Sequence, residues 1–292
     1  MPTLLLDAAS LAASLSSGSW LVLDVRHALT DPDAGHRQFL EGHIPGAVFL
    51  HQDNDLAGAP TGHNGRHPLP DPTILSRQLT DAGLAPNTHV VVYDADTGAF
   101  AARAWWLLRW LGHDKVSMLD GGWRAWQEHG GTQEKGPGTG AQVGRSSPAS
   151  AWTGSGQPDT EQHMPTTDAS MLEQDAAARD WTLVDARDAA RYRGEQEPID
   201  PVAGHIPGAS NRPATENLTA TGRFKSPAAL KQDFAELLGP VDAHDVVHYC
   251  GSGIFACHNL FAMELAGLGG SRLYPGSWSD WCSDPERPVA TG

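Results

Sequence analysis

The sequence has few cysteines and few basic residues. Among its 292 residues are 3 cysteines, and 20 lysines and arginines stand against 35 aspartates and glutamates, which gives a formal net charge of −15 at pH 7. Three unevenly spaced cysteines do not fit a disulfide-rich secreted domain or a zinc ribbon. An acidic chain repels phosphate backbones and anionic lipid surfaces, so we expect neither nucleic acid nor a membrane as a partner.

Long apolar runs and a basic leader are also lacking. No apolar stretch approaches the roughly 20 residues of a membrane-spanning helix. No lysine or arginine precedes Arg26, so the start of the chain does not resemble a secretory signal. Scarce cysteine suits a reducing compartment, and together these features predict a soluble protein of the cytoplasm. The length and the hydrophobic content of 40% are sufficient for two domains with cores of their own.

Several short segments occur twice, in the same order and at a nearly constant spacing. The segment Gly-His-Ile-Pro-Gly-Ala is found at residues 42–47 and again at 204–209, and an aspartate–arginine segment ends at both Arg26 and Arg187. Ordered repetition of this kind indicates two copies of one domain. Between the copies lies a stretch rich in Gly, Ser, Thr, Gln and Pro, which is typical of a linker. The predicted divisions are a domain at residues 1–130, a linker at 131–163 and a second domain at 164–292.

Each copy alternates short strand-like segments with helix-like ones. Residues 90–93 and 246–249 are mostly β-branched or apolar, as in buried strands, whereas residues 101–111 and 228–238 have apolar residues at helical spacing. Strands that alternate with helices predict a mostly parallel sheet with helices on both faces. We therefore predict an α/β fold of two tandem domains. In such sheets, functional sites form where the carboxyl ends of strands meet the starts of helices.

Cys250 lies at an edge of this kind. It follows the expected strand at 246–249, and Gly251 and Gly253 separate it from the next expected helix. Glycines permit backbone angles at which the loop N–H groups converge, and such a nest favours a thiolate. We predict that Cys250 is a nucleophile; the alternative is an inert buried cysteine at the end of a strand. Asp94 occupies the matching position in the first copy and cannot serve as a sulfur nucleophile, so we expect that copy to be non-catalytic.

The repeated segments, the Cys250 loop and the Gly-Ser-Trp segment at 276–278 together resemble the tandem-domain rhodanese family of sulfurtransferases over nearly the whole chain. The resemblance implies two rhodanese-like domains, of which the first is inactive and the second carries sulfur as a cysteine persulfide. It implies a small anionic sulfur donor and an acceptor that is a thiol, such as that of thioredoxin, or cyanide. We expect no cofactor and no bound metal.

The residues after the cysteine bear on the identity of the donor. Family members that prefer 3-mercaptopyruvate carry Gly-Ser-Gly-Val-Thr-Ala, and those that prefer thiosulfate carry basic residues. Residues 251–253 match the first pattern, which predicts 3-mercaptopyruvate, but Ile254 and Phe255 depart from it. A thiosulfate:cyanide sulfurtransferase therefore remains an alternative, and Phe255, whose counterpart is Phe100, is equally well interpreted as a packing residue. The loop residues predicted to bind the substrate are Gly251, Gly253, Ile254, Phe255 and Ala256.

By the same resemblance, Ser252 corresponds to a serine that works with a histidine and an aspartate of the first domain in mercaptopyruvate enzymes. His67 and Asp53 lie in the matching stretches. A Ser–His–Asp set can take the proton of a donor thiol and return it to the departing enolate. Asp55 is an alternative to Asp53. The chain has 14 histidines, and His67 could instead be a solvated loop residue without a catalytic role.

Two arginines of the second copy are candidate substrate ligands. Arg187 has a counterpart in Arg26, which favours an ion pair common to both copies. Arg191 has Thr30 at its matching position, and an arginine specific to the second copy fits recognition of a substrate carboxylate. Arg191 also matches the substrate-binding arginine of the family. Some mercaptopyruvate enzymes have a second such arginine at the position where this chain has Ile199.

The same residues bear on three other functions. A phosphatase-like Cys-x5-Arg loop needs an arginine where this chain has Ala256. A zinc hydrolase fails because His63 and His67, although four residues apart, lie in a glycine-rich segment that is a poor helix. A non-enzymatic persulfide carrier remains open, since it needs no proton relay. Cys257 and Cys282 are expected to be packed and inert.

Overall fold

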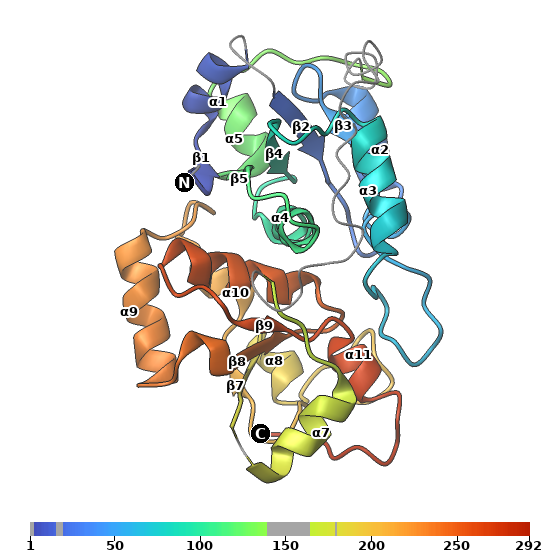
Figure 1. Cartoon of the computed structure of the whole chain (residues 1–292), viewed down its shortest axis with the longest axis vertical. Helices are drawn as coiled ribbons and strands as arrows, with labels where there is room; N and C mark the ends of the chain where they lie inside the picture. Colours follow the sequence, from blue (N-terminus) through green and yellow to red (C-terminus); the bar gives the residue numbers. More distant parts are fainter. Residues whose placement is uncertain (1–2, 16–19, 139–163, 179) are drawn as a thin grey trace. The chain divides into compact units, whose positions relative to one another are not determined.

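The computed structural model describes residues 3–15, 20–138, 164–178 and 180–292 (Figure 1). The chain forms two compact units, and each is described by itself. The first unit comprises Met1–Gly58 and Pro70–Asp159, and the second comprises Ala59–Leu69 and Thr160–Gly292. Residues 59–69 therefore belong to the second unit although they interrupt the sequence of the first. Most of the predicted linker, residues 139–163, lies outside the described residues.

The first unit contains a five-stranded parallel sheet with the strand order β1-β5-β4-β2-β3. Its strands are β1 (Leu5–Leu6), β2 (Trp20–Asp24), β3 (Val48–Phe49), β4 (His89–Tyr93) and β5 (Val116–Leu119). Its helices are α1 (Ala8–Ser14), α2 (Ala34–Glu41), α3 (Pro72–Asp81), α4 (Ala99–Trp110) and α5 (Gly122–Glu128).

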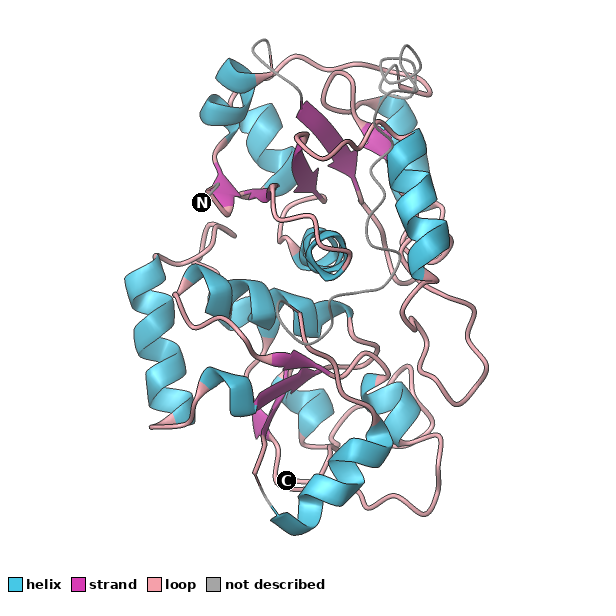
Figure 2. Ribbon diagram, in the orientation of Figure 1, coloured by secondary structure: helices cyan, strands magenta, loops and turns pink. Residues whose placement is uncertain are grey.

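Helices cover both faces of this sheet (Figure 2). Val91 and Tyr93 of β4 pack in one core cluster with residues of α1, α2 and α5. Successive side chains of a strand point to opposite faces, so Val90 and Val92 belong to the other face, and both are fully buried. Helix α4 packs closely along β4 and β5. The predicted α/β class is confirmed for this unit.

The second unit repeats the arrangement with four parallel strands in the order β7-β6-β8-β9. The strands are β6 (Thr182–Asp185), β7 (Ser210–Asn211), β8 (Val246–Tyr249) and β9 (Arg272–Leu273). The helices are α7 (Ala169–Ala178), α8 (Ala189–Tyr192), α9 (Pro227–Leu238), α10 (Ile254–Leu265) and α11 (Ser277–Trp281), with short 3-10 turns η1 (Ala214–Asn217) and η2 (Ala243–Asp245). Val247 and Tyr249 pack in one core cluster with residues of α7 and α11, whereas α10 packs against β8, β9 and α9.

In both units a left-handed glycine begins the helix that follows the central strand. Gly98 precedes α4 and Gly253 precedes α10, and each has a φ of 81°. A side chain on Gly253 would meet a second obstacle, because its Cβ would lie 2.6 Å from the carbonyl oxygen of Pro275. The glycine in this turn is thus required both by the backbone angle and by close packing. It keeps the loop between β8 and α10 short.

A buried arginine is held in the same way in each unit. Arg26 Nη2 lies 2.6 Å from Asp24 Oδ2 and donates to the Gly42 carbonyl at 2.8 Å. In the second unit Arg187 Nη2 lies 2.6 Å from Asp185 Oδ2 and donates to the Gly204 carbonyl at 2.7 Å. The shared ion pair expected from the repeat is therefore present in both copies. Within the described residues, no helix is both long and apolar enough to cross a membrane.

Candidate active site around Cys250

Cys250 lies at the carboxyl end of β8, where the loop to α10 begins, and it is 1% exposed. Its Sγ accepts the backbone N–H of Gly253 at 3.2 Å. A backbone donor is thus directed at the sulfur, as in an anion-binding turn. The Cys257 thiol, one turn into α10, instead donates to the carbonyl of Gly253 at 3.2 Å and is fully buried.

The matching loop of the first unit is occupied by an anionic group. The Asp94 carboxylate accepts backbone N–H groups from Asp96 at 3.1 Å, Gly98 at 3.0 Å and Phe100 at 3.0 Å. Burial raises the pKa of Asp94, and the N–H groups of Gly98 and Phe100 oppose that rise. A strand–loop–helix turn of this sequence pattern therefore offers several converging donors to a negative atom. In the second unit the atom at the matching position is the sulfur of Cys250.

The start of α11 fixes the Cys250 loop from the other side. The backbone N–H of Cys250 donates to Ser277 Oγ at 3.1 Å. The N–H groups of Trp278 and Ser279 donate to the carbonyls of Cys250 and Gly251 at 2.9 and 3.0 Å. Sequence reasoning missed Ser277, although it belongs to one of the repeated segments, because Gly122 occupies its place in the first copy.

Ser252 and His67 are brought together. Ser252 Oγ lies 2.7 Å from His67 Nδ1, which is hydrogen-bond distance. His67 reaches the Cys250 loop because its segment is docked on α11: the N–H of Arg66 donates to Ser279 Oγ at 3.0 Å. Gly65 has a φ of 80°, and a Cβ there would lie 2.6 Å from the carbonyl oxygen of Gly276. The approach of the two backbones therefore needs this glycine.

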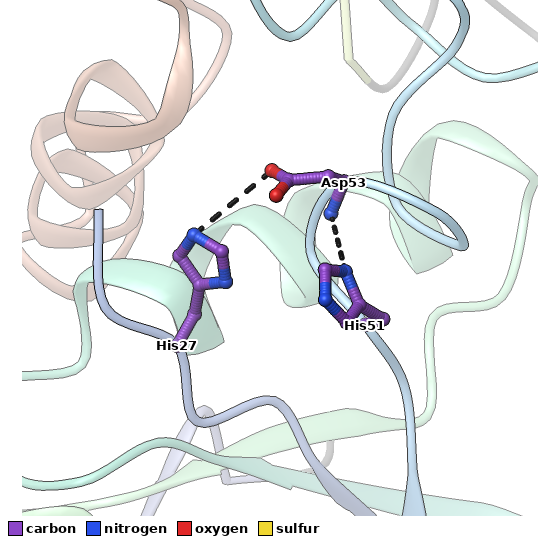
Figure 3. Close-up of side chains that lie close together, drawn as sticks. All are labelled: His27, His51 and Asp53. Atoms are coloured by element: carbon purple, nitrogen blue, oxygen red, sulfur yellow. Dashed lines mark hydrogen bonds and ion pairs between the residues drawn. The ribbon is translucent and has the colours of Figure 1, made fainter. Parts of the chain in front are cut away.

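Asp53 lies in the first unit, beside two histidines (Figure 3). Its Oδ1 is 3.9 Å from His27 Nε2, and its backbone N–H donates to His51 Nδ1 at 3.1 Å. Asp55 instead stabilises the turn in which it lies, because its carboxylate accepts the backbone N–H of His51 at 2.7 Å and the side-chain amide of Gln78 at 3.1 Å. Of the two aspartates, Asp53 is the one whose carboxylate is directed to a histidine.

His27, His51 and Asp53 offer ligand atoms that all lie within 4.8 Å of one another. A backbone N–H can only donate, so His51 Nδ1 holds a lone pair and the neutral ring carries its proton on Nε2. If His51 bound a metal through Nδ1, it would lose the hydrogen bond from Asp53. If it bound through Nε2, it would have to lose the proton on that atom. Burial lowers the pKa of His27, and the charge of Asp53 partly opposes this. We therefore interpret the two histidines as groups that orient Asp53 rather than as metal ligands.

Arg191 is held by two buried carboxylates. Its Nη2 lies 2.6 Å from Glu197 Oε1 and 3.2 Å from Asp200 Oδ2. Burial acts to raise the pKa of Glu197, but the hydrogen bonds from Arg191 and from the backbone outweigh it, and the pKa lies below its ordinary value. Burial raises the pKa of Asp200, and the charge of Arg66 partly opposes the rise.

Arg187 also contacts this group, with its Nη1 at 3.3 Å from Glu197 Oε2. Its side chain is 2% exposed and stacks over Trp278, with 4.9 Å between the guanidinium carbon and the ring centroid. Its guanidinium is thus engaged by Asp185, Glu197 and a carbonyl. We expect Arg187 to position Glu197 and α11 rather than to contact a donor itself.

The remaining predicted loop residues differ in burial. Ile254 and Ala256, in the first turn of α10, are 1% and 0% exposed, whereas Phe255 between them is half-buried. Ile254 and Ala256 thus support the loop by packing. Phe100, which matches Phe255 in the first unit, packs edge-on against His27 with ring centroids 5.0 Å apart.

Comparison with known proteins gives one family. The rhodanese-like domain model matches residues 7–129 and 168–284. The chain is 50% identical over 291 residues to a probable 3-mercaptopyruvate sulfurtransferase of Pseudomonas aeruginosa, covering 99% of this chain and 98% of that protein. It is 39% identical to a putative thiosulfate sulfurtransferase of Mycobacterium tuberculosis, covering 99% and 97%.

A solved structure agrees with these relatives. The crystal structure of the 3-mercaptopyruvate sulfurtransferase SseA from Escherichia coli matches with a TM-score of 0.76 and 28% identity, over 94% of this chain and 99% of that one. The repeat and the two parallel sheets agree with this family. The chain therefore belongs to the rhodanese-like sulfurtransferases, with the rhodanese-like domain present twice.

Proposed function

We propose that this enzyme takes a sulfur atom from 3-mercaptopyruvate onto Cys250 and passes it to a thiol or to cyanide. The observation that carries the choice of donor is the 2.7 Å contact between Ser252 Oγ and His67 Nδ1, next to Cys250 in the loop. A donor that leaves as an enolate needs a proton moved, and a hydroxyl–imidazole pair can move one. The 50% identity to a probable 3-mercaptopyruvate sulfurtransferase supports the same donor.

In the proposed reaction the Cys250 thiolate attacks the sulfur of 3-mercaptopyruvate. A sulfur–sulfur bond forms, the carbon–sulfur bond of the donor breaks, and its electron pair remains on the carbon as the enolate of pyruvate. The proton of the donor thiol passes through Ser252 and His67 to that carbon, which yields pyruvate and a Cys250 persulfide anion. Loop N–H groups of the kind that hold Asp94 in the first unit would stabilise the terminal sulfur. An acceptor thiolate or cyanide then removes that sulfur and regenerates the Cys250 thiolate.

Asp53 is proposed as the third member of the relay, where it would orient His67 and stabilise its charged form. Its orientation by His27 and His51, in contrast to the turn-bound Asp55, supports this choice. Arg191 is proposed to contact the donor's carboxylate. The physiological acceptor is proposed to be a small protein thiol such as that of thioredoxin, in the cytoplasm. All three cysteines are outside disulfides, which suits a reducing compartment.

Thiosulfate is the second candidate donor. It is favoured by the Ile254–Phe255 departure and by the relative named as a putative thiosulfate sulfurtransferase. When thiosulfate donates its outer sulfur, sulfite leaves and no proton has to be transferred to carbon. A proton relay would therefore have no role in that reaction. A non-enzymatic persulfide carrier would not need the Ser252–His67 pair either, because it transfers no proton.

The test is to compare kcat/KM for sulfur transfer to cyanide from 3-mercaptopyruvate and from thiosulfate. We expect 3-mercaptopyruvate to be the better donor. Ser252→Ala should lower its kcat about 100-fold or more, the range of general acid–base catalysis, and should leave thiosulfate turnover within about two-fold. Cys250→Ser should abolish both. Better turnover with thiosulfate would overturn the assignment of the donor, and transfer that survives Cys250→Ser would overturn the persulfide.

A further inference from the structure

A short segment of the second unit, residues 288–292, pairs with backbone on both sides of one loop; we call this segment the strap. Ala290 and His205 exchange two backbone hydrogen bonds, of 2.8 and 3.0 Å, in an antiparallel bridge. The N–H of Gly292 donates to the carbonyl of Arg193 at 3.1 Å. The strap therefore connects Arg193 with His205, which flank the loop.

The first unit has a strap of the same kind at residues 132–136. Glu134 and His43 exchange two backbone hydrogen bonds of 2.9 Å, and the N–H of Gly136 donates to the carbonyl of Leu40 at 2.9 Å. In both units a tryptophan of the preceding helix donates its indole N–H to the first carbonyl of the strap, at 2.8 Å in the first unit and 2.9 Å in the second. The strap is thus part of the repeat.

The loop that the second strap encloses is not part of the repeat. The strap bonds align Leu40 with Arg193. Glu41 alone separates Leu40 from the repeated Gly-His-Ile-Pro-Gly-Ala segment, whereas residues 194–203, which we call the inserted loop, separate Arg193 from it. The first unit folds without such an insertion. Its presence in the unit with Cys250 therefore points to a role in the reaction rather than in the fold.

The inserted loop contains both carboxylates that hold Arg191. Glu197 Oε1 accepts from Arg191 Nη2 at 2.6 Å and also from the backbone N–H groups of Ile199 and Asp200, at 3.1 and 3.0 Å. Asp200 Oδ2 accepts from the same Nη2 at 3.2 Å. The path of the loop backbone and the position of the guanidinium are therefore coupled through Glu197.

The strap packs closely on the two ends of the inserted loop. Gly204 has a φ of 121°, and a Cβ there would lie 2.4 Å from the carbonyl oxygen of Ala290. Gly194 has a φ of 76°, and a Cβ there would lie 2.9 Å from Thr291 Cγ2. Gly42, the counterpart of Gly204, has an extended φ of 175°, and the nearest atoms to its Cβ would be side-chain atoms. Glycine is thus required at the ends of the loop but not at Gly42.

We propose that the strap positions the inserted loop, through the bridge between Ala290 and His205, and thereby sets the affinity for the sulfur donor. A loop whose two ends are tied together has fewer conformations to lose when a ligand binds beside it. Ala290 acts through Glu197 and Asp200 and is therefore a positioning residue. This inference rests on the proposed function, because it concerns the donor of that same reaction.

Ala290→Pro removes the N–H that donates to His205. KM for 3-mercaptopyruvate should rise about 3- to 10-fold, in keeping with the loss of one backbone hydrogen bond. The value of kcat and its pH profile should change little, because Ser252 and His67 lie outside the inserted loop. A fall in kcat with an unchanged KM would overturn the positioning of the loop by the strap.

The matched control is Glu134→Pro, which removes the corresponding bond to His43 in the unit without the inserted loop. It also removes the carboxylate that accepts the N–H of Gly46 at 2.8 Å, so it perturbs its strap more than Ala290→Pro does. It should nevertheless leave KM within about two-fold, as expected for a distant site. An equal rise in KM in both variants would mean a general loss of stability and would overturn the proposal.

A second pair of variants tests the bridge from its other side. Gly204→Ala directs a methyl group at the carbonyl of Ala290 and should raise KM as Ala290→Pro does. Gly42→Ala makes the same change in the same motif of the first unit, where the backbone angle accepts alanine, and should leave KM unchanged. An unaltered KM in both Gly204→Ala and Ala290→Pro would overturn the positioning role.

Hydrogen exchange followed by mass spectrometry gives a readout that does not depend on turnover. In Ala290→Pro the amides of residues 194–203 should exchange about ten-fold faster, whereas those of β8 should not change. Unchanged exchange in the inserted loop would overturn the strap, whatever the kinetics. Faster exchange with an unchanged KM would remove the positioning role and leave the proposed function intact. If the protein used thiosulfate and not 3-mercaptopyruvate, the proposed function would fail, but faster exchange with a raised KM for thiosulfate would still support the strap.

Discussion

The hydroxyl of Ser277 accepts the backbone N–H of Cys250 at 3.1 Å and donates to the carbonyl of Tyr274 at 2.9 Å. Ser277 makes both bonds from a left-handed backbone with a φ of 55°, and it is the one non-glycine residue with a positive φ in the described part of the chain. Gly122, its counterpart in the repeat, has the same φ of 55°. The fold requires this backbone angle in both units, and only the unit with Cys250 places a side chain there.

Two substitutions at Ser277 separate the cost of its backbone angle from the contribution of its hydroxyl. Ser277→Ala leaves the buried N–H of Cys250 without its partner and keeps the strained angle, at a cost of about 1–3 kcal/mol in the free energy of unfolding. Ser277→Gly loses the same bond but relieves the strain, so it should be more stable than Ser277→Ala by about 1 kcal/mol. Urea unfolding of the three proteins measures both differences. Equal stability of the two variants would show that the φ of Ser277 carries no cost.

Reactivity should be confined to one cysteine. Burial, followed by the charge of Asp200, raises the pKa of Cys282 to about 11. Cys257 is fully buried and bonded to Gly253. At pH 7.5 we expect iodoacetamide to label Cys250, as judged by mass spectrometry of the peptides. Cys282 should label appreciably only as the pH approaches 11, because the thiolate is the reactive form.

The control for this experiment is Cys282→Ser, which should label at Cys250 at the rate of the unaltered protein. Fast labelling of Cys282 at pH 7.5 would contradict the pKa argument. Fast labelling of Cys257 would mean that the start of α10 opens in solution.

The repeat made much of the fold predictable. The shared segments located the central strands, the arginine–aspartate pairs and the glycines that start α4 and α10, because each copy constrains the other. The comparison of Asp94 with Cys250 also predicted that only the second copy carries a sulfur nucleophile. These features depend on local sequence and on short-range backbone geometry, which a single chain displays directly.

Arg66 could not be found in the same way. Its backbone bond to Ser279 spans 213 residues of sequence, and no repeated segment includes it. Its ion-pair partner is Asp200. That aspartate follows Ile199, a position at which the sequence showed only that an arginine of some family members is absent. Contacts between distant segments depend on tertiary packing and leave no periodic signal in the sequence. The partners of Arg191 were missed for the same reason: its spacing from Arg187 does not reveal Glu197 and Asp200 between them.

Asp53 and Asp55 form a matched pair for testing the relay. Asp53→Asn keeps the shape of the side chain but removes the charge that orients and stabilises a histidine, so kcat for 3-mercaptopyruvate should fall about 10- to 100-fold or more. Asp55→Asn alters a turn, where it accepts from His51 and Gln78, and should lower stability more than kcat. Steady-state kinetics with both variants decide between the two carboxylates. A larger loss of kcat in Asp55→Asn would reverse the assignment.

His248 should make the second unit sensitive to acid. Burial, followed by the charge of Arg212, lowers the pKa of this fully buried imidazole to about 3, from an ordinary value of 6.5. Between these values the unfolded chain binds a proton that the folded chain does not, so the stability contributed by this group is present above pH 6.5 and is lost as the pH falls. The slope is about 1.4 kcal/mol per pH unit for one such group.

The repeat supplies the replacement for this test, because the first unit has Val92 at the matching position of its central strand. His248→Val removes the buried titrating group and its contact with Met263 Sδ at 3.0 Å. Urea unfolding at pH 7 and pH 4.5 should show that the variant loses less stability on acidification than the unaltered protein, because its core no longer has an imidazole to protonate. His244→Ala, at a side chain that is 74% exposed, should leave the loss unchanged. Equal losses in His248→Val and the unaltered protein would place the acid-sensitive group elsewhere in the chain.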